Sequence, residues 1–308
     1  MKKLPRILKY TAENADEGRA VREIIKHEFR LVAHDIARAK HRTERGITVN
    51  GECALTSRIL KEGDVVEVIL ADEEPERTVP AEGPLEILYE DEDLICLNKP
   101  PGVVVHPSHG HFCDSLGNAL AWYFQEKGEP HEIRMVGRLD KDTSGVICFG
   151  KSRTACAHLA GQTGNAPAKK EYLALAEGVF AEPEGFVDAP ISREYEEKIR
   201  RVVRADGNPA YTSYRVLRQY DGYALLSVDI MTGRTHQIRV HMAHIGHPLL
   251  GDPIYGGQSG LVRSIHRAAL HAWKLTFTQP FTGEVVTVTA PLPEDMHLFC
   301  CNSGAHRL

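Results

Sequence analysis

A polar loop precedes a strongly apolar stretch in the middle of the chain. The loop carries Arg138, Asp140, Asp142 and Thr143, and the apolar stretch covers Val146–Phe149. Polar groups at the start of a strand can be held rigidly by backbone hydrogen bonds, which suits a catalytic carboxylate. The same residue types also suit a surface turn, in which short polar side chains bond to the nearby backbone. The loop residues alone do not decide between these two interpretations.

Four histidines lie close together further along the chain, at His236, His241, His244 and His247. His241 and His244 are three residues apart and would share one face of a helix. A metal site needs at least three converging ligands, which are usually supported by further hydrogen bonds. A metal hydrolase built on these histidines and Asp252 is therefore an alternative function that has to be weighed.

Four stretches in the second part of the chain resemble the RluA family of RNA pseudouridine synthases. They are Leu94–Val105 with its Asn98-Lys99-Pro100-Pro101-Gly102, Arg138-Leu139-Asp140 with Thr143-Ser144-Gly145, Lys169–Ala174, and Thr232–His241 followed by His247–Asp252. The resemblance covers nearly all of residues 85–295. Gly137 departs from the family, which usually has histidine there, and is more similar to the related RsuA type. We expect this departure to affect the substrate and not the chemistry.

The resemblance implies a role for individual residues. Asp140 matches the essential aspartate of the family, Arg239 the arginine that pairs with it, and Tyr172 the residue that stacks on the target base. A carboxylate in a closed pocket needs an opposite charge nearby to stay ionised. The target nucleotide must be flipped out of the RNA to reach such a pocket. The residues predicted to bind the substrate are Arg138, Thr143, Arg234, His236 and Gln237.

The implied reaction converts a uridine of a structured RNA to pseudouridine, with ribosomal RNA the first expectation and transfer RNA the second. The bond between N1 and C1′ breaks, the uracil turns, and C5 joins C1′. This needs neither a redox change nor a group donor, so no cofactor and no metal are expected. Asp140 would attack C6 of the base or act at C1′, and the sequence leaves both routes open. A non-catalytic RNA-binding protein is the other alternative, and the intact aspartate, tyrosine and arginine motifs argue against it.

Residues 1–70 predict a small separate domain. Hydrophobic periodicity indicates strands and helices at Arg6–Tyr10 (strand), Gly18–Phe29 (helix), about His34–Arg42 (helix), Gly46–Gly51 (strand and Asn-Gly turn) and Lys61–Val68 (turn and strand). Over about residues 18–70 the pattern resembles the S4 domain, a small RNA-binding module, chiefly in Arg45–Gly51 and Gly63–Val66. It departs from that family in its spacing and at Leu31–His34, where a serine often begins the second helix.

The charge distribution favours RNA binding only as a local patch. Residues 1–70 hold 14 Lys and Arg against 11 Asp and Glu, which is a net charge of +3. Since the whole chain has a net charge of −5, the remaining residues carry −8. The molecule as a whole therefore does not attract a polyanion. Helices that present basic side chains can grip phosphates without reading sequence. The residues predicted to bind RNA in this domain are Arg22, Arg38, Lys40 and Arg45.

The predicted fold class is α+β, with the S4-like domain followed by a catalytic domain of pseudouridine synthase type around a mixed, largely antiparallel sheet. Residues 71–84 are acidic and proline-rich, which predicts a linker, and residues 85–308 form the catalytic domain. Its expected strands and helix are Leu94–Leu97, Val146–Phe149, Tyr172–Ala176, Leu225–Ile230 and the helix Leu116–Glu126.

The composition predicts a cytoplasmic protein, and a monomer is the default expectation, on which the sequence itself is silent. No apolar run approaches the roughly 18 residues of a membrane span, and the start of the chain lacks the apolar core of a signal peptide. The seven cysteines include no Cys-x-x-Cys pair, so we expect them to be small buried residues and not disulfides or zinc ligands. The final residues, Cys300–Leu308, show no packing pattern and predict a loose tail.

Overall fold

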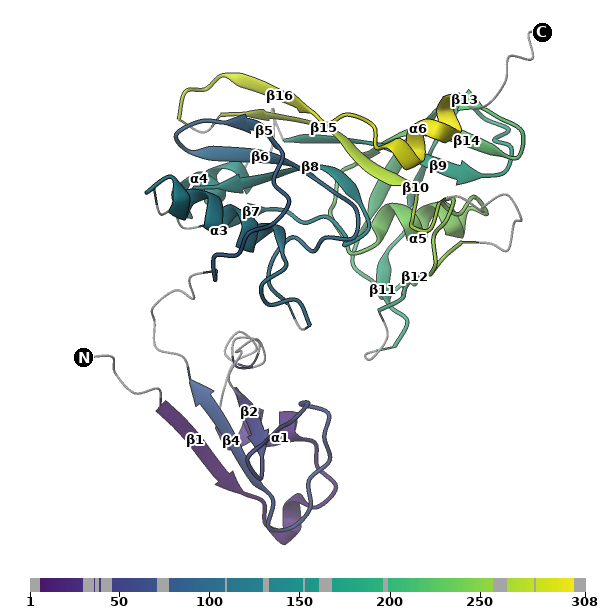
Figure 1. Cartoon of the computed structure of the whole chain (residues 1–308). Coiled ribbons are helices and arrows are strands. Elements are labelled where there is room, and N and C mark those ends of the chain that lie inside the picture. The colour runs from purple at the N-terminus through teal and green to yellow at the C-terminus, as the bar shows by residue number, and fades with distance from the viewer. Residues whose placement is uncertain are drawn as a thin grey trace, which may run out of the picture. The chain divides into compact units, whose positions relative to one another are not determined.

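The computed structural model of the chain divides into two compact units (Figure 1). One unit comprises residues 1–77 and 108–112, and the other comprises residues 78–107 and 113–308. The structure describes residues 6–29, 36, 39, 46–70, 78–108, 110–129, 133–151, 153–160, 168–195, 199–256, 265–279 and 281–301.

The first unit is built on a four-stranded antiparallel sheet. In order across the sheet its strands are β1 (Arg6–Thr11), β4 (Val65–Leu70), β2 (Ile47–Val49) and β3 (Glu52–Cys53). The helix α1 (Val21–His27) packs on the sheet through Ile24 and Ile25, and a 3-10 turn, η1 (Asn14–Asp16), precedes it. The buried Ile36 and Ala39 belong to the same core.

The predicted elements of this unit are confirmed where the structure describes them. Asn50 and Gly51 have φ angles of 54° and 78°, which is the left-handed conformation that a tight hairpin turn needs. The helix is shorter than the predicted Gly18–Phe29, because Ala20 is extended and forms an antiparallel bridge with Ile59. The second predicted helix, His34–Arg42, lies outside the described residues except for Ile36 and Ala39, which are helical.

The second unit contains a mixed sheet that is mostly antiparallel, as predicted. In order along it the strands are β10 (Glu184–Asp188), β13 (Tyr211–Gln219), β14 (Tyr223–Ile230), β9 (Lys169–Glu177), β15 (Leu270–Thr278), β8 (Ser144–Gly150), β6 (Leu94–Lys99) and β5 (Ile87–Glu90). In addition, β16 (Val285–Thr289) pairs with β15, and β7 (Arg134–Val136) pairs with β8. Among the strands that the structure describes, only β8 and β15 pair in parallel. A separate hairpin is formed by β11 (Ile191–Arg193) and β12 (Arg201–Val203).

Alternate residues of the central strands contribute to different cores, because successive side chains of a strand point to opposite faces. On β9, Ala174 and Ala176 pack with α5 (Gln237–His244), whereas Leu175 packs with α6 (Glu294–Cys301). The same alternation separates α3 (Leu116–Glu126) from α4 (Arg153–Ala160) across β6 and β8. Burial on both faces explains why these strands read as continuous apolar runs in the sequence.

Part of the predicted linker is attached to α3. Nδ2 of Asn118 donates a hydrogen bond to the carbonyl of Val79 (2.7 Å), and the amide of Ala81 donates to the carbonyl of Asn118 (3.2 Å). The chain is therefore anchored to the second unit from about residue 79 onward.

The cysteines are less uniformly buried than expected. The six described cysteines for which a state is assigned are free thiols. Cys96 and Cys148 are buried, but Cys53 and Cys113 are exposed, so the expectation of burial is wrong for these two.

Within the part of the chain that the structure describes, no helix is long and apolar enough to cross a membrane.

Candidate active site

Asp140 lies in the loop that connects β7 to β8. The amide of Thr143 donates to the carbonyl of Asp140 (3.1 Å), which closes a tight turn, and β8 begins one residue later. Thr143 is buried, whereas the Asp140 side chain remains 21% exposed. The loop therefore has a rigid base and presents one carboxylate to solvent.

Lys99 at the end of β6 holds this loop from the other side. The side chain is fully buried, and its Nζ donates to the carbonyls of Pro100 (2.8 Å), Val103 (2.7 Å) and Lys141 (2.6 Å). Lys141 is the residue that follows Asp140, so the ammonium joins two loops directly beside the carboxylate. Burial lowers the pKa of Lys99 to about 7, against the opposing negative charges of Asp142 and Asp140.

The loop also depends on the close approach of β8 to β15. Gly145 has a φ of 109°, and a Cβ there would overlap the backbone of Ala272 on β15. Only glycine fits both constraints. Beside it, Oγ of Ser144 shares a hydrogen bond with Nδ1 of His271 (2.9 Å). The Ser-Gly pair that follows the catalytic loop in the sequence therefore fixes the parallel contact between these strands.

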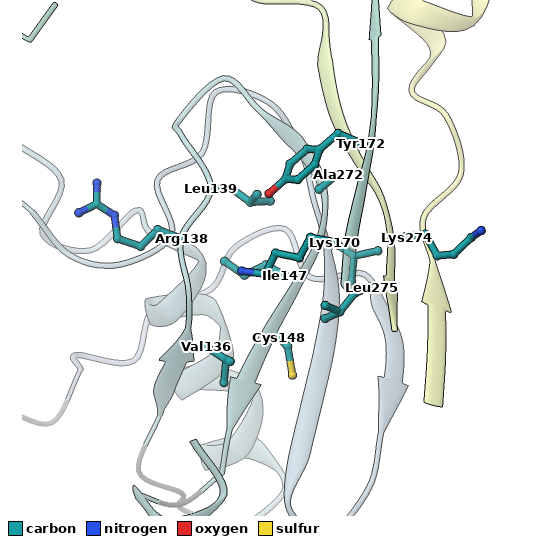
Figure 2. Close-up of a pocket in the computed structure, with 11 residues that line it drawn as sticks. Val136, Arg138, Leu139, Ile147, Cys148, Lys170, Tyr172, Ala272, Lys274 and Leu275 are labelled. Carbon is teal, nitrogen blue, oxygen red and sulfur yellow. The ribbon is translucent and has the colours of Figure 1, made fainter. Parts of the chain in front are cut away.

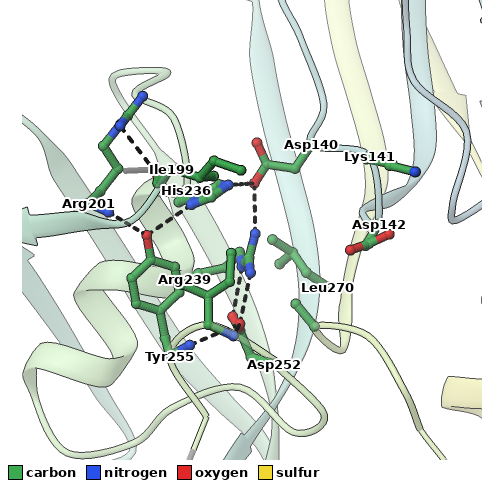
Figure 3. A network of polar contacts seen from close by, with 12 residues as sticks. Asp140, Lys141, Asp142, Ile199, Arg201, His236, Arg239, Asp252, Tyr255 and Leu270 are labelled. Atoms are coloured by element: carbon green, nitrogen blue, oxygen red, sulfur yellow. Dashed lines mark hydrogen bonds and ion pairs between the residues drawn. The ribbon is translucent and has the colours of Figure 1, made fainter. Parts of the chain in front are cut away.

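Arg239 on α5 places a positive charge beside Asp140 (Figure 3). Its Nη1 lies 3.6 Å from Oδ2 of Asp140. Nε and Nη2 of the same guanidinium donate to the two oxygens of Asp252, at 2.7 Å and 2.8 Å. Asp252 is completely buried and also accepts from the backbone amides of Ile254 and Tyr255. The bidentate pair fixes the guanidinium, so its third nitrogen faces Asp140 without reorganisation.

His236 approaches the same carboxylate oxygen. Its Nε2 lies 4.0 Å from Oδ2 of Asp140, and its Nδ1 lies 2.9 Å from the hydroxyl of Tyr255. His236 has a φ of 59°, in the left-handed region, at the position that starts α5. Burial lowers the pKa of His236, and the charge of Asp140 opposes this effect. The imidazole is therefore neutral near pH 7.

Tyr172 on β9 lines a pocket next to the catalytic loop. Figure 2 shows its ring directed toward Leu139, with Arg138 and Lys170 among the other lining residues. Burial raises the pKa of Tyr172, and the nearby charge of Asp140 raises it further. Tyr172 is therefore a neutral phenol with an apolar ring face, which suits stacking on a flat base.

Comparison with known proteins identifies the family. Residues 93–244 match the model of the family described as RNA pseudouridylate synthase. An uncharacterized RNA pseudouridine synthase of Bacillus subtilis (strain 168), YhcT, is 40% identical over 256 residues, which cover 82% of this chain and 84% of YhcT. The chain belongs to the RNA pseudouridine synthase family. It is an isomerase that converts uridine to pseudouridine in RNA, and the expected resemblance is confirmed at this level.

Two further comparisons agree with this pseudouridine synthase assignment. The ribosomal large subunit pseudouridine synthase D of Nitrosomonas europaea is 40% identical over 260 residues, which cover 82% of this chain and 75% of that protein. The structure of human RNA pseudouridylate synthase domain containing 1 superposes with a TM-score of 0.56 and 28% identity, covering 68% of this chain and 83% of that chain. The fold prediction for the catalytic domain is thereby confirmed.

The departure at Gly137 has a local explanation in this pseudouridine synthase. Gly137 has a φ of 82°, and a Cβ there would lie 2.6 Å from Nζ of Lys170. The Lys170 ammonium thus occupies the space in which a side chain at position 137 would begin. Burial lowers the pKa of Lys170. The histidine that is usual at this position in the family would have to displace Lys170.

Two of the other residues predicted to bind the substrate, Gln237 and Arg234, make hydrogen bonds within the protein. Gln237 is buried; its Oε1 accepts from Thr232 and from the amide of Arg234, and its Nε2 donates to the carbonyl of Tyr211. Gln237 thus holds the turn before α5 internally. Nε of Arg234 donates to the carbonyl of Pro209. Direct contact of Thr143, Arg234 and Gln237 with the substrate stays a prediction.

Two site residues were not predicted from the sequence, Arg201 and Tyr255. Tyr255 lies three residues after Asp252, so the motif that ends at Asp252 could have been extended to reach it. Arg201 lies on the β11–β12 hairpin, and no local pattern marks it. Burial lowers the pKa of Arg201, and the neighbouring Arg193 and Arg138 lower it further. Arg201 therefore lies close enough to Arg193 and to Arg138 to be repelled by both charges.

Two of the four clustered histidines, His241 and His247, are occupied by internal hydrogen bonds. Nδ1 of His241 bonds Oγ1 of Thr212 and its Nε2 bonds the carbonyl of Ala189, both at 2.9 Å. His247 bonds the carbonyl of Glu177 (2.8 Å). Among the described residues, no group of three or more His, Cys, Asp or Glu is arranged to hold a metal ion. These bonds leave the metal hydrolase alternative without a ligand set in the described part of the chain.

Proposed function

We propose that this pseudouridine synthase modifies one or a few uridines of large-subunit ribosomal RNA, with Asp140 as its catalytic carboxylate. The observation that carries the proposal is the asymmetry of that carboxylate. Arg239 and His236 both face Oδ2. Among the described residues Oδ1 accepts no hydrogen bond, and both contacts drawn in Figure 3 end on Oδ2. One oxygen is therefore held by charge while the other is available to the substrate, as nucleophilic catalysis requires.

The chemistry needs only groups that the site already has. Breaking N1–C1′ and joining C5 to C1′ moves one hydrogen: the C5 proton leaves to solvent, and N1 gains a proton. Oδ1 of Asp140 starts this rearrangement by forming a bond to C6 of the base or to C1′, and the bond breaks again when the product forms. Arg239 balances the negative charge of the carboxylate before it attacks and after it is released, and Tyr172 stacks on the base while it turns.

Ribosomal RNA is proposed as the substrate because relatives of similar sequence are named for it, including the large-subunit enzyme of Nitrosomonas europaea. The cluster of Arg138, Arg193 and Arg201 supports binding of a polyanion next to Asp140. This substrate implies a cytoplasmic enzyme, and we propose that it acts as a monomer.

The N-terminal domain is proposed to be an S4-like module, with domains at residues 1–70 and 85–308 and a linker at 71–84. A small sheet with a basic helix supports this proposal. Arg22 is exposed on α1, whereas Arg38, Lys40 and Arg45 lie outside the described residues. We propose that these four residues contact RNA phosphates.

The deciding experiment maps pseudouridines by carbodiimide labelling and primer extension in cells that carry the gene, lack it, or carry Asp140→Asn. We expect defined sites of large-subunit ribosomal RNA to lose modification in both altered strains. Loss of pseudouridine at transfer RNA sites alone would show that the substrate is transfer RNA and not ribosomal RNA. Unchanged modification in the Asp140→Asn cells, with loss in the cells that lack the gene, would contradict the role of Asp140.

A matched experiment in vitro measures tritium release from transcripts labelled at C5 of uridine. We expect Asp140→Asn to lower the rate at least about 1,000-fold, because it removes the nucleophilic charge and keeps the shape. The control is Asp221→Asn, which makes the same change at an exposed position in the β13–β14 turn.

A further inference from the structure

We infer that Tyr255 is a positioning residue that holds His236 in the tautomer with its hydrogen on Nε2, so that this N–H faces Asp140. The inference rests on the proposed role of Asp140 as the catalytic carboxylate. It assigns to Tyr255 a task that it performs through the side chain of His236.

The three groups involved form a buried chain of contacts. The backbone N–H of Arg201 on β12 donates to the hydroxyl oxygen of Tyr255 (2.8 Å). That hydroxyl lies 2.9 Å from Nδ1 of His236. His236 and Tyr255 are 8% and 9% exposed, so water does not readily replace either contact. Figure 3 shows the chain running from Arg201 through Tyr255 and His236 to Asp140.

Counting donors and acceptors selects one tautomer. A backbone N–H can only donate, so the Tyr255 oxygen accepts from Arg201. The phenol keeps a single hydrogen of its own, and among the described residues its acceptor within hydrogen-bond distance is Nδ1 of His236. If Nδ1 carried a hydrogen, two donors would converge on one oxygen and the phenol hydrogen would remain buried without a partner, which is costly.

The other nitrogen of His236 must then carry the hydrogen. A neutral imidazole has one N–H, and burial of His236 favours the neutral form. With Nδ1 bare, Nε2 presents its N–H toward Oδ2 of Asp140, 4.0 Å away. The opposite tautomer would turn a lone pair toward a carboxylate, which is repulsive. Tyr255 thus determines whether His236 supports the negative charge of Asp140 or opposes it.

Tyr255 is tied to the rest of the site by more than its hydroxyl. Its backbone amide donates to Oδ1 of Asp252 (3.1 Å), and the guanidinium of Arg239 lies 5.2 Å from the centre of its ring. A Tyr255→Phe variant keeps both of these contacts and removes only the hydroxyl. It therefore separates the hydrogen bond to His236 from the packing around Arg239.

The direct test is nitrogen-15 NMR of the histidine side chains in the intact free enzyme, with the His236 signals assigned by their absence from His236→Gln. Ring nitrogens with and without hydrogen have well-separated resonances. We expect wild-type His236 to carry hydrogen on Nε2, and Tyr255→Phe to give a mixture of tautomers. Hydrogen on Nδ1 in the wild type, or an unchanged tautomer in Tyr255→Phe, would overturn the inference. This readout does not depend on any RNA, so it stands even if the proposed substrate fails.

The kinetic test uses tritium release from a large-subunit ribosomal RNA transcript labelled at C5 of uridine. We expect Tyr255→Phe to lower kcat about 10-fold, as for one lost hydrogen bond, and to leave KM nearly unchanged. The control is Tyr89→Phe on β5, which loses a hydroxyl bond to Asp91 away from the site and should keep full activity. A rise in KM with unchanged kcat would assign Tyr255 to binding and contradict the positioning role.

Two substitutions of His236 give an independent check. The amide of glutamine reaches about as far as Nε2 and can keep an N–H directed at Asp140, whereas the amide of asparagine ends near Nδ1. We therefore expect His236→Gln to retain more of kcat than His236→Asn, with equal thermal stability confirming that both fold. The reverse order of activities would show that the hydrogen belongs on Nδ1. Failure of the wild type itself on this transcript would count against the proposed substrate and not against the tautomer.

Discussion

Arg239 is held by two carboxylates that differ in exposure. Asp252 is completely buried and binds the guanidinium with both oxygens, whereas Asp140 is 21% exposed and lies 3.6 Å from the remaining nitrogen. Since Asp252 already fixes the guanidinium, Asp140 experiences its charge without being locked in a bidentate pair. This division of tasks between two aspartates places a fixed positive charge beside Asp140 and leaves its side chain partly exposed to a substrate.

At this scale we predict that Asp252→Asn damages stability and activity together. The substitution leaves the buried Arg239 without its negative partner, which should cost about 3 kcal/mol of unfolding free energy and at least about 10-fold in kcat. Urea unfolding and tritium release measure the two effects. The control is Asp206→Asn, which breaks an exposed ion pair with Arg204. It should change neither the unfolding free energy nor kcat beyond experimental error. Full activity of Asp252→Asn would contradict the positioning of Arg239 by Asp252.

The loop that carries Asp140 leads into the parallel contact between β8 and β15, which pairs Ser144 with His271 and Gly145 with Ala272. On the opposite side, the loop after β6 reaches the catalytic loop through Lys99. The turn that carries Asp140 is thus supported by two elements that are remote from it in sequence. Its rigidity belongs to the sheet and not to the loop residues themselves.

The Lys99 contacts predict that a substitution of Lys99 leaves the loop that carries Asp140 less rigidly held. Lys99→Met keeps the buried volume but leaves three carbonyls without their shared donor. We expect unfolding free energy to fall by about 2 to 3 kcal/mol and kcat to fall about 10-fold, because each lost buried hydrogen bond costs about 1 kcal/mol. Denaturant unfolding and single-turnover rates measure this. The surface variant Lys61→Met serves as the control, and equal stability of both variants would show that Lys99 does not support the loop.

The buried His271 predicts a pH dependence of stability. Burial lowers the pKa of His271 to about 4, from the ordinary value of 6.5. Below pH 6.5 the unfolded chain therefore binds a proton at His271, whereas the folded protein binds this proton only below about pH 4. The contribution of His271 to stability is complete above pH 6.5 and is lost progressively as the pH falls toward 4, by up to about 3 kcal/mol.

Urea unfolding of the wild type and of His271→Gln at pH 7, 6 and 5 tests this sign. We expect the variant to lose less stability between pH 7 and 5 than the wild type. His266→Gln changes an exposed histidine next to the same strand and should keep the wild-type slope. A wild-type slope in His271→Gln would mean that other groups control the acid side of the profile.

At the scale of the whole molecule, the two units have separate hydrophobic cores. The core of the first unit consists entirely of residues between Tyr10 and Val68, and the cores of the second unit begin at Leu85. The charge is also divided unequally: residues 1–77 and 108–112 hold 15 Lys and Arg and 15 Asp and Glu, so the first unit is neutral and the second unit carries the whole −5. The first unit is therefore the less anionic of the two toward RNA.

This division predicts the effect of removing the first unit. A chain that starts at Thr78 should fold, because its cores are complete, and should keep Asp140 in place. Its affinity for a ribosomal RNA transcript should fall, and the dependence of log affinity on log salt should become less steep by about 0.9 for each lost phosphate contact. Filter binding over a range of salt measures both. Identical affinity and slope for the two chains would contradict RNA binding by residues 1–77.

The sequence by itself determined the local features of this protein. The strands Val146–Phe149 and Tyr172–Ala176 and the helix Leu116–Glu126 were predicted because burial and periodicity act over a few neighbouring residues. The linked motifs identified the family and singled out Asp140. Glycines such as Gly145 are readable in the same way, since one backbone conformation demands one residue type.

The motifs already paired Asp140 with Arg239, but the tertiary structure alone decided how this pair is held and which further side chains surround it. Asp140 and Arg239 are brought together from distant elements, and the amide of Arg201 meets the hydroxyl of Tyr255 across 54 residues of chain. Tertiary contacts also gave Gln237 internal hydrogen-bond partners that the motif does not show, while its contact with the substrate stays a prediction. A residue's neighbours in sequence constrain its backbone, but hydrogen-bond partners and electrostatic surroundings are set by chain segments whose meeting no local pattern records.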